Sequence, residues 1–186
     1  MITDYLTTAK RDFQYYKTLG EKTFSQLEEK DCFWQFDSES NSIAVIVNHL
    51  YGNMKSIWTD FLSSDGEKQW RKRELAFKNQ LKTKAEVLNR WEQGWDCVFK
   101  SLDSINEDNF NTKIYIRSQE HSVIQAINRQ LTHYAYHVGQ VVYIGRLIKG
   151  SKWKYLSIPK GKSDDFNQEK FSRGKHQGQF TIIFSK

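Results

Sequence analysis

The chain has 186 residues and a mass of 22.1 kDa, which suits one domain with a substantial hydrophobic core. Its 12 phenylalanines, nine tyrosines and six tryptophans exclude a disordered polar chain, and no apolar run approaches the ~18 residues of a membrane-spanning helix. Residues 1–148 hold 19 basic and 19 acidic side chains, whereas residues 149–186 hold nine and three, so the net charge of +6 belongs to the C-terminal end. This distribution argues against a nucleic-acid-binding face and predicts a solvated basic extension at 151–186.

The amino terminus and the cysteines favour a cytoplasmic protein. The opening sequence, MITDYLTTAKRDF, carries Asp4 and Asp12 and lacks the basic-then-apolar order of a secretory signal. Cys32 and Cys97 lie far apart without a CxxC spacing, which supports neither a disulfide framework nor a cysteine-rich metal site. We expect both to be small buried side chains, and we expect no membrane partner.

Apolar residues recur at helical spacing in four segments, and the chain contains a single proline. The predicted helices cover about 3–27, 42–62, 84–102 and 119–148. Ser42 and Ser118 are the expected N-caps of the second and fourth helices. Four long helices joined by moderate connections predict an all-α fold, a four-helix bundle over residues 1–150.

Two connections interrupt this helical pattern. Between the second and third helices lies SSDGEKQWRKREL, in which Asp65-Gly66 is a turn signal. Within it, Trp70–Arg73 has the composition of an anion- or lipid-binding segment, although a solvated charge run is the favoured interpretation. After the fourth helix, Pro159 and Gly161 predict a short irregular extension packed by residues such as Trp153, and the terminal FTIIF fits either a strand or an unstructured end.

The chemistry-bearing residues concentrate in the predicted fourth helix. His133 and His137 are four residues apart, about 40° around the helix axis, so both imidazoles project from one face. This is the spacing at which a helix offers two nitrogen ligands to one metal. His49 in the second helix is the candidate third ligand, whereas His121 and His176 are weaker candidates.

Other residues near the histidine pair are candidates for supporting roles. The histidine face is expected to line a cleft or a wet subunit interface, because an aliphatic stripe centres roughly 150° away, at Ile124, Ile127, Leu131, Val138 and Val142. Arg129, one turn before His133, is a candidate for binding an anionic substrate group, with a surface arginine paired to a carboxylate as the alternative. Asn53 and Gln140 are candidates to orient the imidazoles, with ordinary surface polarity as the alternative.

The residues between the paired histidines differ from those of helical zinc proteases. Such proteases carry a glutamate within HExxH as general base, and here the intervening residues are Tyr134, Ala135 and Tyr136. This departure argues against peptide hydrolysis. We expect both tyrosines to be packing residues, since such rings bury large areas, with hydroxyl transfer through Tyr134 or Tyr136 as the alternative.

The arrangement of these histidines resembles that of the DinB/YfiT-like metal-binding bundles, the DinB superfamily. The resemblance extends to a bacterial subgroup whose markers are NSIAVIVNHLYGNMKSIWTDFL with DGEK at 41–68, AINRQLTHYAYHVGQVVYIGRL at 126–147 and WKYLSIPKGKSDDFN at 153–167. These blocks together are far more specific than HxxxH alone.

The resemblance implies a site of His49, His133 and His137 that holds a divalent cation, Zn²⁺ or Ni²⁺, with positions open to water or substrate. It also implies a homodimer and thiol-dependent chemistry with a low-molecular-weight thiol such as bacillithiol or mycothiol. The expected function is therefore a metal-dependent enzyme of the thiol S-transferase type that activates a thiol, or water as in a hydrolase, toward a small electrophile in detoxification or stress. The alternative is a non-catalytic metal- or ligand-binding bundle with a structural or sensing role.

Overall fold

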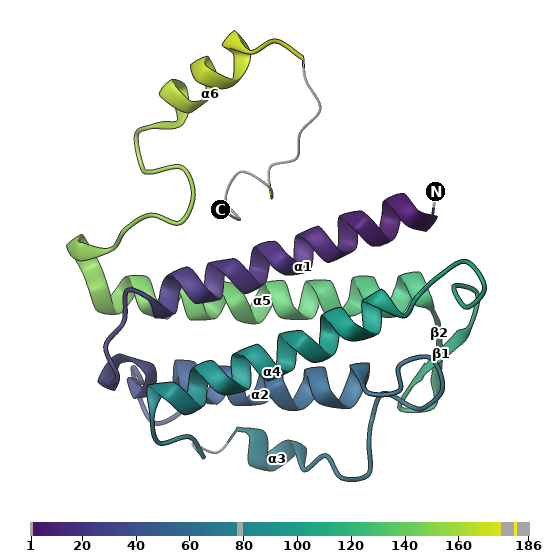
Figure 1. The fold of residues 1–186 in the computed structure, drawn as a ribbon. Coiled ribbons are helices and arrows are strands. Elements are labelled where there is room, and N and C mark those ends of the chain that lie inside the picture. The colour runs from purple at the N-terminus through teal and green to yellow at the C-terminus, as the bar shows by residue number, and fades with distance from the viewer. Residues whose placement is uncertain (1, 78–79, 176–180, 182–186) are drawn as a thin grey trace.

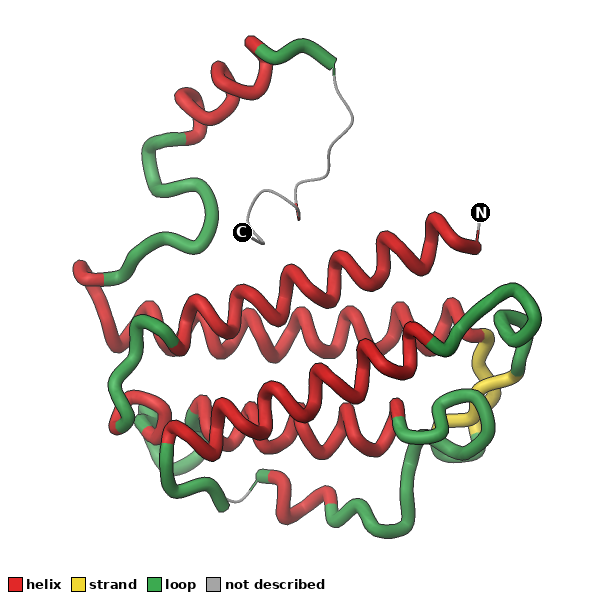
Figure 2. The backbone as a smooth tube through the Cα atoms, viewed as in Figure 1, coloured by secondary structure: helices red, strands yellow, loops and turns green. Residues whose placement is uncertain are grey.

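The computed structural model describes residues 2–77, 80–175 and 181, and its helices confirm the all-α four-helix bundle (Figure 1). The two strands are short, as Figure 2 shows. The elements in chain order are α1 (Ile2–Phe24), η1 (Lys30–Phe33), α2 (Ile43–Trp58), α3 (Arg73–Ala76), α4 (Lys84–Asp103), β1 (Lys113–Ile116), β2 (Gln119–Ser122), α5 (Val123–Lys149), η2 (Gly150–Lys152) and α6 (Ser163–Ser172).

The bundle consists of two helix pairs, α1 beside α5 and α2 beside α4 (Figure 1). Helices α2 and α4 run in the same direction, because residues 59–83 carry the chain back along the bundle before α4 begins. This return segment contains α3, which packs against α2. Residues 71–77 are thereby placed next to the middle of α2, where His49 lies.

Local capping explains where the helices begin. The Ser42 hydroxyl accepts a hydrogen bond from the Val45 N–H at 3.3 Å, as predicted. Thr83 and Glu86 form a reciprocal capping box at the start of α4. Helix α2 ends at Trp58, four residues before the predicted end, and Asp60 follows with a φ of 51° in the left-handed region.

The predicted start of the fourth helix is wrong. Helix α5 begins at Val123, not at residue 119, and its N-cap is Ser122, which forms a capping box with Gln125. The residues before it form a hairpin in which Lys113 faces Ser122 and Ile116 faces Gln119. The predicted cap, Ser118, lies instead in the two-residue turn of this hairpin.

A contact from elsewhere in the chain supports the hairpin turn. Arg117 and Ser118 have φ values of 55° and 61°, as a type I′ turn requires, although neither residue favours that conformation. The Asp65 carboxylate accepts hydrogen bonds from both of their backbone N–H groups, at 2.8 and 2.7 Å. Gly66 N–H also donates to Tyr115 C=O at 2.8 Å, so the predicted Asp65-Gly66 turn anchors the hairpin.

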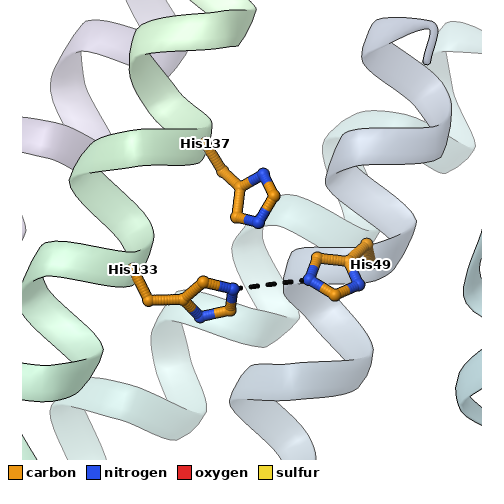
Figure 3. Close-up of side chains that lie close together, drawn as sticks. All are labelled: His49, His133 and His137. Atoms are coloured by element: carbon orange, nitrogen blue, oxygen red, sulfur yellow. Dashed lines mark hydrogen bonds between the residues drawn. The ribbon is translucent and has the colours of Figure 1, made fainter. Parts of the chain in front are cut away.

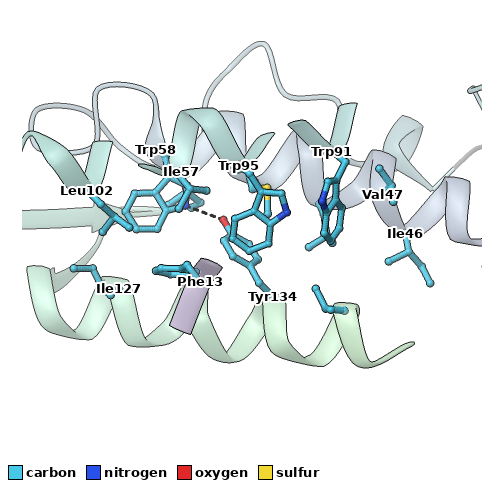
Figure 4. Close-up of a cluster of buried hydrophobic side chains, with 14 of the residues drawn as sticks. Phe13, Ile46, Val47, Ile57, Trp58, Trp91, Trp95, Leu102, Ile127 and Tyr134 are labelled. Atoms are coloured by element: carbon cyan, nitrogen blue, oxygen red, sulfur yellow. Dashed lines mark hydrogen bonds between the residues drawn. The ribbon is translucent and has the colours of Figure 1, made fainter. Parts of the chain in front are cut away.

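Several aromatic rings pack against one another and against aliphatic side chains in the core (Figure 4). Tyr134 is fully buried on α5, and its ring contacts Phe13 and Trp95 in tilted and edge arrangements. Ile127 and Val138 of the predicted aliphatic stripe are buried, but Ile124 is 39% exposed. The buried face of α5 therefore centres on Tyr134, and this face lies nearer to the histidine face than the aliphatic stripe that the sequence predicted as the core.

The sequence predicted an irregular C-terminal extension, but part of this extension is helical. Trp153 is buried, as expected, and its ring lies over Gly145, where a Cβ would approach it to 3.3 Å. Beyond Gly161 the chain forms α6, which buries none of its residues and lies apart from the four long helices (Figure 1). The acidic residues Asp164 and Asp165 in its first turn favour this helix. The FTIIF segment lies outside the described residues except for Thr181.

Two smaller expectations concern the cysteines and the membrane. Cys32 is buried, as expected, whereas Cys97 is only half-buried. Within the described ranges, no helix has the length and apolarity that crossing a membrane requires.

Candidate metal centre

The structure brings together the three histidines that the sequence singles out. His133 and His137 project from adjacent turns of α5 toward His49 on α2 (Figure 3). One ring nitrogen from each lies within 4.8 Å of the others, and the Nε2 atoms of His49 and His133 are 3.4 Å apart. We call this group the histidine cluster.

The spacing and chemistry of the cluster fit a divalent metal. Two imidazole nitrogens bound to Zn²⁺ at ~2.0–2.1 Å in tetrahedral geometry are separated by about 3.4 Å. The His49–His133 distance matches this separation. Two polar hydrogens pointing at each other would not be stable at that distance, so at least one of these nitrogens presents a lone pair.

The surroundings of the three histidines favour their neutral form, which is the form that binds metals. Burial, together with the neighbouring imidazoles and the positive charges of Arg71 and Arg73, lowers the pKa of His49 to about 3 and that of His133 to about 4. Burial also lowers the pKa of His137, whereas the hydrogen bond that His137 donates to Gln140 raises it. All three imidazoles are therefore neutral at pH 7, as a metal ligand must be.

Gln140 orients one ligand in the way expected of a supporting residue. Its Oε1 lies 3.2 Å from His137 Nδ1 and accepts a hydrogen bond there, so the proton is held on Nδ1 and the lone pair is on Nε2. On the other side of the cluster, the Phe77 ring stacks on His49 with centroids 4.5 Å apart. Gln140 and Phe77 thus restrict the rotation of two of the three rings.

Asn53 supports the site less directly than expected. Its Oδ1 accepts a hydrogen bond from the Tyr134 hydroxyl at 3.0 Å rather than from an imidazole. The same hydroxyl accepts from Trp58 Nε1 at 2.9 Å, a contact drawn in Figure 4. Tyr134 is accordingly a packing residue, as expected, and its hydrogen bonds fix α5 against α2 next to the histidines. Tyr136 is 66% exposed and is not a packing residue.

A cavity of about 210 Å³ opens beside the cluster. Its wall includes His49 and His133, together with Asn53, Ile57, Glu67, Arg71, Arg73, Ile116, Arg117, Arg129 and Gln130. Arg129 is exposed, lines the cavity and donates a hydrogen bond to His121 Nε2 at 3.2 Å, and no carboxylate among the described residues pairs with it.

The favoured interpretation of Trp70–Arg73 as a solvated charge run is also wrong in part. The Arg71 side chain is only 6% exposed and pairs with Glu67 at 3.3 Å. Arg71 and Arg73 both face the cavity, whereas Trp70 is 57% exposed. Sequence reasoning missed Arg117 and Glu67 as cavity residues, because only the hairpin and the return segment bring them there.

A comparison with protein-family models places the chain in a family. The family model "Protein of unknown function (DUF1572)" matches residues 1–162. The chain belongs to this family. The family lies within the DinB-like superfamily, in line with the resemblance of the sequence blocks. No curated protein and no solved structure matches the chain.

Proposed function

We propose that this member of the DUF1572 family is a metal-dependent enzyme of the thiol S-transferase type, which joins a low-molecular-weight thiol to a small electrophile. The convergence of three neutral imidazoles beside a cavity is the observation that supports the proposal. The three histidines of the cluster would hold Zn²⁺ or Ni²⁺. Because these ligands carry no charge, the cation would keep its double charge and favour the thiolate form of a thiol near neutral pH.

The cavity has no free general base among the described residues that line it. Its carboxylate, Glu67, pairs with Arg71 at 3.3 Å and with Arg117 at 3.2 Å. The nearby Tyr134 hydroxyl is buried and bonded to Trp58 and Asn53, and burial raises its pKa above the ordinary value. The nucleophile therefore has to lose its proton to solvent.

This feature favours a thiol over water as the nucleophile. A thiol that coordinates such a metal is deprotonated outright, whereas zinc-bound water still has a pKa of about 7, so a thiol would need less assistance to ionise near neutral pH. For an alkyl chloride electrophile, the thiolate sulfur forms a bond to carbon, the carbon–chlorine bond breaks, and the electron pair leaves with chloride. The thiol proton passes to solvent, and no oxidant or reductant is needed.

Metal content provides the first test. We expect about one equivalent of zinc or nickel per chain in tag-free protein, measured by mass spectrometry, and little in His133→Ala. His121→Ala is the matched control, because His121 lies outside the cluster, and it should retain the metal. Wild-type protein that stays empty after dialysis against zinc, nickel and manganese would refute the metal site.

A second pair of measurements separates the enzyme from a non-catalytic bundle. In Co²⁺-loaded protein, added cysteine, bacillithiol or mycothiol should change the visible absorption spectrum if a coordination position is open. The same thiols should react with monochlorobimane faster in the presence of wild type than of His137→Ala. An unchanged spectrum together with no difference in rate would favour a structural or sensing role.

A further inference from the structure

The cavity beside the histidine cluster is strongly basic for its size. Four arginines line it, at positions 71, 73, 117 and 129, against the single carboxylate of Glu67. Glu67 pairs with Arg71 and Arg117, which leaves Arg73 and Arg129 without a carboxylate among the described residues. The contact of Arg129 with His121 does not neutralise its charge, because an imidazole that accepts a hydrogen bond is itself neutral. The wall therefore carries an excess of positive charge although residues 1–148 are balanced.

Arg71 shows that this charge is built into the fold rather than scattered on the surface. Its side chain is 6% exposed, yet its Nε atom is buried without a hydrogen-bond partner. A buried guanidinium N–H that lacks an acceptor is costly, and Arg71 is among the residues that line the cavity.

The size and position of the cavity limit what would fill it. Its volume of about 210 Å³ lies below the ~300–1,000 Å³ of pockets that take drug-sized ligands. Guanidinium groups bind carboxylate and phosphate through paired N–H donors. His49 and His133 form part of the same wall, so a small molecule held by the arginines has its other atoms close to the metal ligands.

We infer that the substrate or thiol co-substrate carries a small oxyanion, a carboxylate or a phosphate, and that Arg71, Arg73 and Arg129 hold this group beside the histidine cluster. The inference rests on the proposed function, because it names the chemical class that the site accepts. Arg71 contributes the buried donor, and Arg73 and Arg129 contribute unpaired charge at the rim. Glu67 holds Arg71 in place through its ion pair.

Calorimetric titration of tag-free protein at low ionic strength tests the inference without any activity assay. The probes are inorganic phosphate and malonate, each added to metal-free and to zinc-loaded protein. We expect at least one probe to bind both forms. Arg73→Gln and Arg129→Gln should each weaken that binding roughly tenfold, as expected for the loss of one charge-assisted hydrogen bond. Arg173→Gln is the matched control, since Arg173 lies beyond α6 and pairs with Glu169, and it should change affinity less than twofold.

The outcomes separate this inference from the proposed function. Binding of neither probe to either form would refute the oxyanion site, even if metal is present. Binding that requires zinc and is unchanged in both arginine variants would also refute it, because the anion would then sit on the metal alone. Protein that binds a probe through the arginines but never binds metal would refute the proposed enzyme and leave the oxyanion site standing. The preferred probe identifies the group as a phosphate or a carboxylate.

Discussion

Removal of the Tyr134 hydroxyl should destabilise the bundle without emptying the metal site. In Tyr134→Phe, the indole N–H of Trp58 loses its acceptor and the amide oxygen of Asn53 loses its donor. Trp58 is 2% exposed, so its N–H finds no water and costs about 1–3 kcal/mol. Asn53 lines the cavity, where water can replace the lost donor, so the unpartnered Asn53 oxygen costs less than the Trp58 N–H. We expect a total loss of about 2–3 kcal/mol.

Urea denaturation of the metal-free protein, followed by tryptophan fluorescence, measures this loss. For a chain of this length the change corresponds to a melting temperature lower by roughly 4–12 °C. Tyr136→Phe is the matched control, two residues away and 66% exposed, and it should stay within about 0.5 kcal/mol of wild type. Zinc content should be unaltered in both variants, since neither tyrosine belongs to the histidine cluster.

A loss below about 1 kcal/mol for Tyr134→Phe would refute this reasoning, because it would mean that the buried N–H is satisfied without the hydroxyl. Loss of metal from Tyr134→Phe with unchanged stability would also contradict it. The hydroxyl would then support the ligands instead of the packing between α2 and α5.

Three further predictions concern stability. Gly20→Ala should destabilise the protein by about 1–2 kcal/mol, because the new Cβ would lie 2.2 Å from the Trp91 ring. Gly52→Ala, where a Cβ would have no atom within 4 Å, should stabilise α2 by about 0.5–1 kcal/mol, and equal effects of the two variants in urea denaturation would exclude this explanation. Asp65→Ala should lower the free energy of unfolding by about 1–2 kcal/mol and speed amide hydrogen exchange in the hairpin, because it removes the acceptor for both turn N–H groups. Unchanged exchange would argue against that role. In metal-free protein, the melting temperature should fall as the pH drops from about 6.5 toward 4, because the histidines of the unfolded chain bind protons in this range whereas those of the folded cluster, whose pKa values are lowered, stay neutral. Replacement of all three histidines by Gln should flatten this pH dependence, and a wild-type melting temperature that does not change with pH would contradict the pKa assignment.

Much of the fold follows from local patterns in the chain. The apolar spacing of the long helices and the Ser42 cap are properties of neighbouring residues, so the bundle and the start of α2 were predictable. The pairing of His133 and His137 is equally local, since four residues make slightly more than one helical turn. His49 was a candidate third ligand from its place in the second predicted helix, and the family resemblance supported its connection with that pair.

Contacts between distant residues decided the rest. The β1–β2 hairpin has no Asn-Gly or Asp-Gly turn, and Asp65 supports its left-handed residues from more than fifty positions away, so no local signal marked it. Arg71 looked like part of a solvated charge run, because nothing nearby in sequence shows that the return segment folds over α2. The sequence therefore determined the helices and the paired histidines, whereas burial and charge around them depend on which segments pack together. Only the tertiary structure shows that His49 and His133 of the histidine cluster share a cavity with four arginines.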